Sequence, residues 1–231
     1  MRSMFKVVTY LVAVSGCSSR APTENVAVTS AQVITVANSV LTRDESNART
    51  AQYIAETTLT PSNVGASTFG RLYSRTVDGR IYAQPLYVEN LTIGGTTKNV
   101  VYVATATNNL YAFDADATST SPDAGVIWQR SGTNRLGTPA LTQHGAFGSN
   151  VTPYMGIVGT PVIDPASSPP TMYLVTMEEL TGPTSFLYHL RAIDITTGND
   201  VSGKPPLTIA HSEFGITFDA SYEIQRAGFC C

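Results

Sequence analysis

The amino-acid sequence predicts an all-β protein built from short strands. Charged residues make up only 13% of the 231 residues, about half the usual share, and Thr, Ser, Gly, Val and Tyr are abundant. Runs of β-branched and aromatic residues, which favour strands, are broken repeatedly by turn-forming residues. The net charge of −3, without a basic patch, argues against a nucleic-acid partner.

The first 17 residues are predicted to be an export signal. Arg2 and Lys6 supply positive charge, residues 7–14 form a short apolar run, and small residues precede Cys17. This order resembles a bacterial lipoprotein signal, in which Cys17 would be lipidated; a plain secretory signal or a chance cysteine are the alternatives. The run is too short to span a bilayer. We therefore expect a periplasmic or outer-envelope protein, held at the membrane only by a lipid on Cys17.

The remaining chain divides into a linker and a folded domain. Residues 18–46 predict a flexible tether, with a strand within residues 31–40 as the alternative. The domain is predicted over residues 47–231. Apart from Cys17 the chain contains only Cys230 and Cys231, so no disulfide framework is expected.

The first predicted hairpin lies at the start of the β pattern. Strands are expected over residues 69–77 and 81–88, joined by a turn at Asp78-Gly79. Pro85 restricts the second strand to an edge, an end or a bulge.

A second hairpin is predicted from Val100 to Asp114. Residues 100–103 and 110–113 suit strands, and Asn108-Asn109 between them can adopt the left-handed backbone of a tight turn. Residues 125–130 predict a further strand.

The second half of the chain repeats the first in the same order. Residues 159–164 match residues 83–88, residues 171–176 match residues 99–105, and residues 190–195 match residues 110–115. The spacing is 76 residues from Pro85 to Pro161 and 80 from Asp114 to Asp194, so insertions must fall in loops. A repeated four-stranded antiparallel unit is the sequence form of a β-propeller blade.

These segments resemble the quinoprotein repeat. Residues 110–115 and 190–198 match a strand pattern L-x-A-x-D followed by x-T-G, and residues 159–164 resemble its T-P-V-x-D strand. Trp128 holds the tryptophan position of the following strand. The resemblance covers residues 47–209 and implies a quinoprotein alcohol dehydrogenase-like β-propeller, the fold of pyrroloquinoline-quinone (PQQ) enzymes and of non-enzymatic relatives. It is specific for the fold and does not by itself imply an activity.

Two departures from the family pattern limit this resemblance. The second unit has no tryptophan after Thr197-Gly198. Propellers have four to eight blades, whereas the sequence predicts about two to three, so we expect a partial propeller and interpret the chain as a truncated or frame-shifted product.

The acidic residues give no catalytic set. A PQQ enzyme would hold a calcium ion beside the quinone and use an aspartate as base. Asp114, Asp164 and Asp194 recur at repeat positions, however, and are expected to cap turns. Glu178 and Glu179 are adjacent, so on a strand they would face opposite sides of the sheet.

The remaining candidates for chemistry are also expected to be structural. His144, His189 and His211 lack metal-ligand spacing. The pair Cys230-Cys231 has no flanking match to the adjacent-cysteine disulfide of the quinone-dependent dehydrogenases. Tyrosines on the predicted strands are expected to pack between blades: Tyr73, Tyr82, Tyr87, Tyr102, Tyr111, Tyr173 and Tyr188. No catalytic residue, metal or cofactor is predicted.

The sequence thus predicts an exported binding or scaffold module with protein partners at the cell envelope. The alternative is the N-terminal part of a PQQ-dependent alcohol or sugar dehydrogenase. PQQ and calcium would be cofactors only under that alternative.

Overall fold

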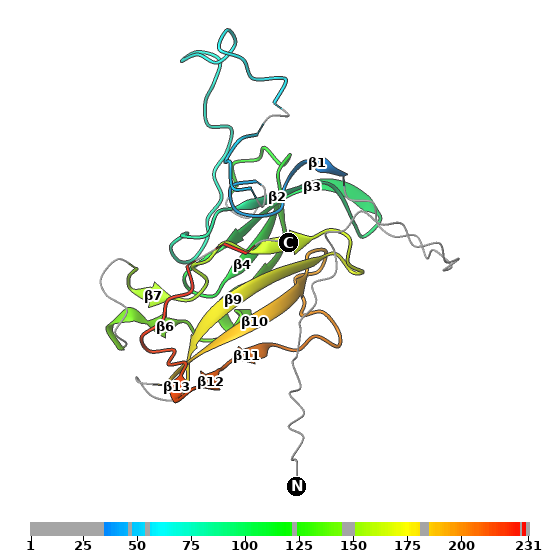
Figure 1. Cartoon of the computed structure of the whole chain (residues 1–231). Coiled ribbons are helices and arrows are strands. Elements are labelled where there is room, and N and C mark those ends of the chain that lie inside the picture. Colours follow the sequence, from blue (N-terminus) through cyan, green and yellow to red (C-terminus); the bar gives the residue numbers. More distant parts are fainter. Residues whose placement is uncertain are drawn as a thin grey trace.

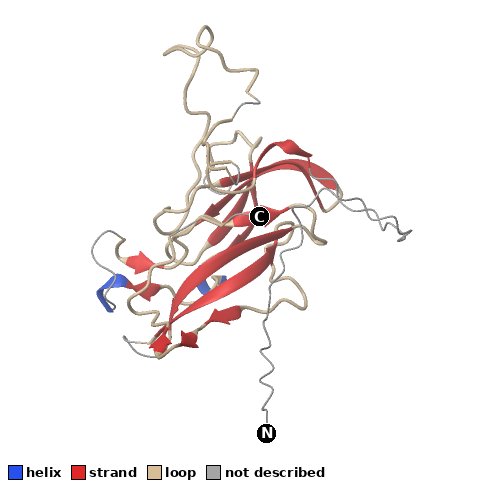
Figure 2. Ribbon diagram, in the orientation of Figure 1, coloured by secondary structure: helices blue, strands red, loops and turns tan. Residues whose placement is uncertain are grey.

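The computed structural model describes residues 35–45, 48–53, 56–121, 124–144, 151–180, 185–226 and 228–229. Over these residues the protein is all-β, and its helical content is confined to two single-turn 3-10 helices, η1 (Gly132–Asn134) and η2 (Thr142–His144) (Figure 2). The predicted export signal, Cys17, Cys230 and Cys231 lie outside the described residues.

Two antiparallel sheets form the body of the protein (Figure 1). The first contains, in chain order, β1 (Thr35–Val40), β2 (Leu86–Ile93), β3 (Thr96–Ala104), β4 (Leu110–Asp114) and β5 (Val126–Arg130). The second contains β8 (Val162–Asp164), β9 (Thr171–Glu179), β10 (Phe186–Asp194) and β11 (Leu207–Ile209). Two-stranded sheets are formed by β6 (Ala140–Leu141) with β7 (Tyr154–Met155) and by β12 (Ser212–Glu213) with β13 (Ile216–Thr217).

The predicted hairpin from Val100 to Asp114 is confirmed by the pairing of β3 with β4. Val100 lies opposite Asp114, and Tyr102 lies opposite Ala112. The turn contains Asn108 with a φ of 57°, the left-handed conformation that asparagine tolerates better than most residues. The strand predicted over residues 125–130 is confirmed as β5.

The two large sheets reproduce the predicted repeat of a four-stranded antiparallel unit. Strands β2 to β5 and β8 to β11 both run in chain order across their sheets. Equivalent backbone hydrogen bonds follow β4 and β10: the Asp114 amide donates to the Gly125 carbonyl at 2.7 Å, and the Asp194 amide to the Asn199 carbonyl at 2.9 Å. The two units therefore match in local geometry as well as in sequence.

The hairpin predicted around Asp78-Gly79 is wrong. Residues 69–77 form no strand, and β2 begins at Leu86 rather than at residue 81. Pro85 has no N–H to donate to a ladder, and the segment is instead tied to the sheet by separate contacts. The Tyr73 hydroxyl donates to the Ala115 carbonyl at 2.7 Å, and the Asp78 amide donates to the Tyr111 hydroxyl at 3.0 Å. Residues 73–78 therefore lie on the outer face of the first sheet, where Val77 packs against Val103, Tyr111 and Phe113.

The flexible tether predicted for residues 18–46 is wrong for the C-terminal part of this range. Thr35–Val40 forms β1, the strand that was the alternative for this region. It pairs antiparallel with β2, with Thr35 opposite Glu89 and Val40 opposite Tyr87. Residues 56–72 (cyan in Figure 1) extend away from the sheets and are almost all exposed.

The main core lies between the two large sheets. Alternate residues of β2, β3 and β4 point into it, and they meet Met172, Leu174 and Ile193 of the second sheet. The other face of the second sheet carries Val175 and Met177, which are covered by a layer that contains β6, β7 and residues 218–226 and 228–229. The second sheet is therefore the middle of three layers.

Trp128 of β5 joins the two units. Its indole Nε1 donates to the Ile195 carbonyl at 3.0 Å, and the Tyr102 hydroxyl donates to the same carbonyl at 2.9 Å. The indole also lies on Gly198, where an added Cβ would come within 2.6 Å of the ring. Gly198 has a φ of 76°, so both the close approach and the backbone conformation require glycine at this position.

Candidate functional site

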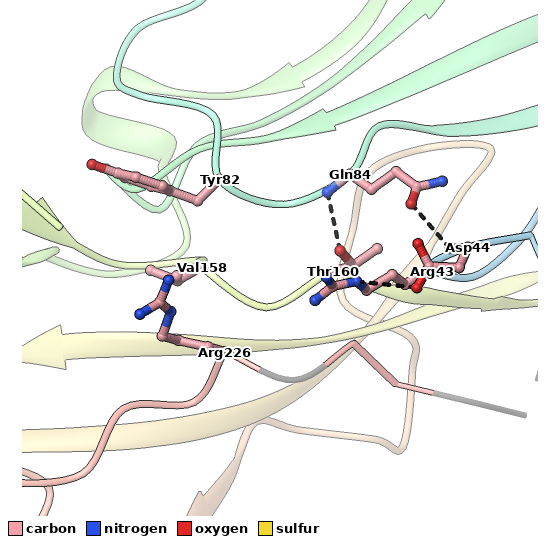
Figure 3. A pocket seen from close by; sticks show the side chains of 7 residues that line it. All are labelled: Arg43, Asp44, Tyr82, Gln84, Val158, Thr160 and Arg226. Carbon is pink, nitrogen blue, oxygen red and sulfur yellow. Dashed lines mark hydrogen bonds and ion pairs between the residues drawn. The ribbon is translucent and has the colours of Figure 1, made fainter. Parts of the chain in front are cut away.

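The best candidate for a binding site is a cleft of about 350 Å³ beside the start of β2 and β8. Figure 3 shows the side chains that line it, which come from four segments: Arg43, Asp44, Tyr82, Gln84, Val158, Thr160 and Arg226. Clefts of this size fall at the lower end of the range that holds small organic ligands.

Repeat-equivalent positions meet at the floor of the cleft. Gln84 precedes Pro85 in the first unit, and Thr160 precedes Pro161 in the second. The Gln84 amide N–H donates to the Thr160 hydroxyl at 3.0 Å, and the side-chain oxygen of Gln84 accepts a hydrogen bond from the Asp44 amide at 3.0 Å. The Phe229 amide donates to the Thr160 carbonyl at 3.2 Å. These bonds fix the segments that carry the lining side chains.

The cleft carries two guanidinium groups and one carboxylate. Arg43 Nε lies 3.4 Å from Asp44 Oδ2, and both side chains are partly exposed. Arg226 is exposed and has no ion-pair or hydrogen-bond partner among the described residues. The cleft therefore has an excess positive charge, although the whole chain is acidic.

A second polar cluster, the Glu178 network, is buried between the two sheets. Glu178 Oε1 lies 2.7 Å from Thr176 Oγ1, 2.9 Å from His189 Nδ1 and 2.8 Å from Arg191 Nη2. Burial opposes ionisation of this carboxyl and is the largest single influence on it, but the hydrogen bonds from Arg191, His189 and Thr176 together hold the pKa of Glu178 below its ordinary value.

The Glu178 network continues to the edge of the second sheet. Arg191 Nη1 lies 3.6 Å from Asp200 Oδ1, and Arg130 Nη1 lies 3.4 Å from Asp200 Oδ2. Arg130 also donates to the Gly198 carbonyl at 3.0 Å. The network thus links the two units by charge beside the contact made by Trp128. None of its residues lines the cleft, so we assign it a structural role.

The turn-capping role predicted for the recurrent aspartates matches their geometry. In each case Oδ1 accepts a hydrogen bond from the backbone amide two residues later: Asp114 from Asp116, Asp164 from Ala166, and Asp194 from Thr196. Asp114 Oδ2 also lies 2.7 Å from Lys98 Nζ, and this bond holds the pKa of Asp114 below its ordinary value. These carboxylates are occupied by their own turns.

Glu178 and Glu179 lie on opposite faces of β9, as their adjacency predicts. Glu178 joins the buried network, whereas Glu179 Oε2 accepts a hydrogen bond from the Leu141 amide at 2.9 Å on the other face.

The histidines are not brought together. His189 belongs to the Glu178 network, and exposed His211 lies 3.3 Å from Glu213. His144 falls in η2. Among the residues the structure describes, no group of three or more His, Cys, Asp or Glu side chains could hold a metal ion. Nor does a helix long and apolar enough to cross a membrane occur in that part of the chain.

The tyrosines have mixed roles. Tyr102 packs between the two sheets beside Trp128, with ring centroids 5.8 Å apart, as expected for packing between units. Tyr188 packs on the other face of the second sheet, and burial raises its pKa to about 12. Tyr82, which was also expected to pack between units, lies in the wall of the cleft.

Sequence reasoning missed most of the cleft. Arg43 and Arg226 lie outside the repeat and have no motif that marks them. Gln84 and Thr160 offered the one usable signal, because they occupy equivalent positions before a proline at the start of each unit.

Comparison of the chain with protein-family models, with curated proteins and with solved structures finds no match. The features of the chain that point to a function are therefore the internal repeat, the contact between the two units and the chemistry of the cleft.

Proposed function

We propose that this protein is an exported binding or scaffold module built from β-propeller units of the quinoprotein-repeat type. The contact of Trp128 with Ile195 and Gly198 carries the proposal. It joins the tryptophan position of one unit to the turn that follows L-x-A-x-D in the next, so it connects two defined positions of the same repeat.

A contact of this kind can recur between each unit and the next one. It uses different surfaces on its two sides, which makes it heterologous, and heterologous contacts close into rings when the rotation between neighbours permits. In the first unit, Ala115 holds the position of Ile195 and follows Asp114 as Ile195 follows Asp194. This equivalence supports the two large sheets as neighbouring units of a propeller.

Binding is favoured over catalysis by how the carboxylates are used. Asp114, Asp164 and Asp194 are held in their turns, and Glu178 is held by Arg191. Asp44, the carboxylate in the cleft, lies against Arg43. A general base must reach the proton that it abstracts, and these groups are already engaged.

Titration with PQQ, with and without Ca²⁺, tests this proposal against a PQQ-dependent dehydrogenase. We expect no calcium-dependent change in PQQ absorbance and no calcium-dependent heat with the full chain purified in detergent. Saturable binding of PQQ that requires Ca²⁺ would contradict the binding-module proposal and favour the dehydrogenase.

We also propose that Cys17 anchors the protein to the envelope through a lipid. In a bacterial host supplied with radiolabelled palmitate, the wild-type chain should acquire label and sediment with membranes. Cys17→Ser should remove the label and release the chain from the membrane. Equal labelling of both chains would contradict an anchor at Cys17.

A further inference from the structure

We propose that the cleft binds a small organic molecule through an oxyanion, a carboxylate or a phosphate ester, held by Arg43 and Arg226. This inference rests on the proposed binding function and names the chemical class of ligand.

The charges of the cleft favour an anion. Two guanidinium groups from opposite ends of the described chain line it with one carboxylate, which leaves an excess positive charge. Guanidinium presents paired N–H donors that match the oxygens of carboxylate and phosphate groups. Arg226 has no polar partner among the described residues, so its donors are available to a ligand.

Neutral donors in the cleft could complete the binding site. The side-chain oxygen of Gln84 is taken by the Asp44 amide, so its side-chain NH2 group is the part left to face a ligand. Thr160, whose hydroxyl accepts from the Gln84 amide at 3.0 Å, retains its O–H as a donor. All of these groups are donors, as recognition of an oxyanion requires.

The walls indicate that the anion is part of a larger molecule. The Tyr82 ring and the small exposed part of Val158 give the cleft an apolar surface beside Arg226 (Figure 3). A volume of about 350 Å³ exceeds what a single phosphate or carboxylate group occupies. Asp44 should limit the negative charge that the cleft accepts, because it repels a second anionic group placed near Arg43.

Calorimetric titration of the full chain tests this inference. The probes are phenylacetate for carboxylates, glycerol 3-phosphate for phosphate esters, and inorganic phosphate for the anion alone. We expect one organic probe to bind with one-to-one stoichiometry and more tightly than inorganic phosphate. The preferred probe identifies the oxyanion.

Charge-removing variants locate the binding. Arg226→Gln and Arg43→Gln should each weaken the preferred probe by about tenfold or more, the loss of one charge-assisted hydrogen bond. Asp44→Asn should strengthen it. Arg71→Gln is the matched control, because Arg71 is also exposed but lies outside the cleft. Thermal melting of each variant confirms that it is folded.

Two results would overturn the inference: no binding of any probe by the folded chain, or binding that Arg226→Gln and Arg71→Gln weaken equally. Neither result bears on the contact between units or on the PQQ titration. Failure of the oxyanion site is therefore distinguishable from failure of the proposed function.

Discussion

Trp128→Ala should lower the free energy of unfolding by about 3 kcal/mol, the low end of the range for loss of a large aromatic side chain. Three contacts between the units are lost together. The indole rests on Gly198, packs against Tyr102 with ring centroids 5.8 Å apart, and donates to the Ile195 carbonyl. Urea denaturation followed by far-UV circular dichroism measures the loss. Tryptophan fluorescence cannot be used, because Trp128 is the sole tryptophan and its signal disappears in the variant.

Two further variants separate packing from hydrogen bonding at this contact. Trp128→Phe keeps an aromatic ring but loses the bond to Ile195, so it should cost less than Trp128→Ala. Gly198→Ala approaches the contact from the other unit and should also destabilise, because its Cβ meets the indole and its φ is positive. Tyr222→Ala is the control, since Tyr222 is 70% exposed. If Trp128→Ala and Tyr222→Ala have equal effects, the contact does not hold the units together.

Local patterns predicted the parts of the fold that depend on local chemistry. The Asn108-Asn109 turn, the strands around it and the turn-capping aspartates follow from residue types within a few positions of each other. The internal repeat allowed the strands of the second sheet to be predicted from those of the first. The strand predicted over Phe69 to Val77 is wrong because the composition of a strand is not sufficient to form one. A strand also needs the edge of another strand to pair with, and this segment instead crosses the face of the sheet.

The candidate site could not be predicted for a related reason. Arg43 and Arg226 line the same cleft because β1, which precedes Arg43, joins the first sheet and the segment that carries Arg226 covers the second. The Glu178 network depends on the register of β9 and β10, which places His189 opposite Thr176 and Arg191 opposite Leu174. A hairpin with a long connection does not reveal its register in the sequence. The alternation of side chains along a strand predicted only that Glu178 and Glu179 would lie on opposite faces of the sheet.

Arg191→Met should lower the free energy of unfolding by about 3–5 kcal/mol at neutral pH, the usual cost of breaking a buried ion pair. The Arg191 guanidinium lies 2.8 Å from Glu178 Oε1, and both side chains are only about one-tenth exposed. Without Arg191, the Glu178 carboxylate would stay between the sheets with only Thr176 and His189 as partners. Urea denaturation measures the change, and Lys204→Met, at an exposed lysine that bonds to Tyr173, is the matched control.

The double variant Glu178→Met/Arg191→Met tests whether the ion pair itself stabilises the protein. Glu178→Met leaves Arg191 with Asp200 as its remaining ionic partner, and Arg191→Met leaves Glu178 with Thr176 and His189. Because each single change removes the main partner of a buried charge, the double change should cost less than the sum of the two. Additive costs would show that the two side chains act independently.

Lowering the pH should weaken the wild-type protein through the same carboxylate. Glu178 has a folded-state pKa below its ordinary value of 4.5, so its contribution is complete above that value and is lost as the pH falls through the lower, folded-state pKa. Glu178→Gln cannot lose a proton, so the difference in unfolding free energy between it and the wild type should be constant above about pH 5 and shrink below it. A difference that stayed constant down to pH 3 would mean that folding does not shift the pKa of Glu178, and a difference that grew as the pH fell would mean that burial, the largest single influence, prevails over the bonds to Arg191, His189 and Thr176.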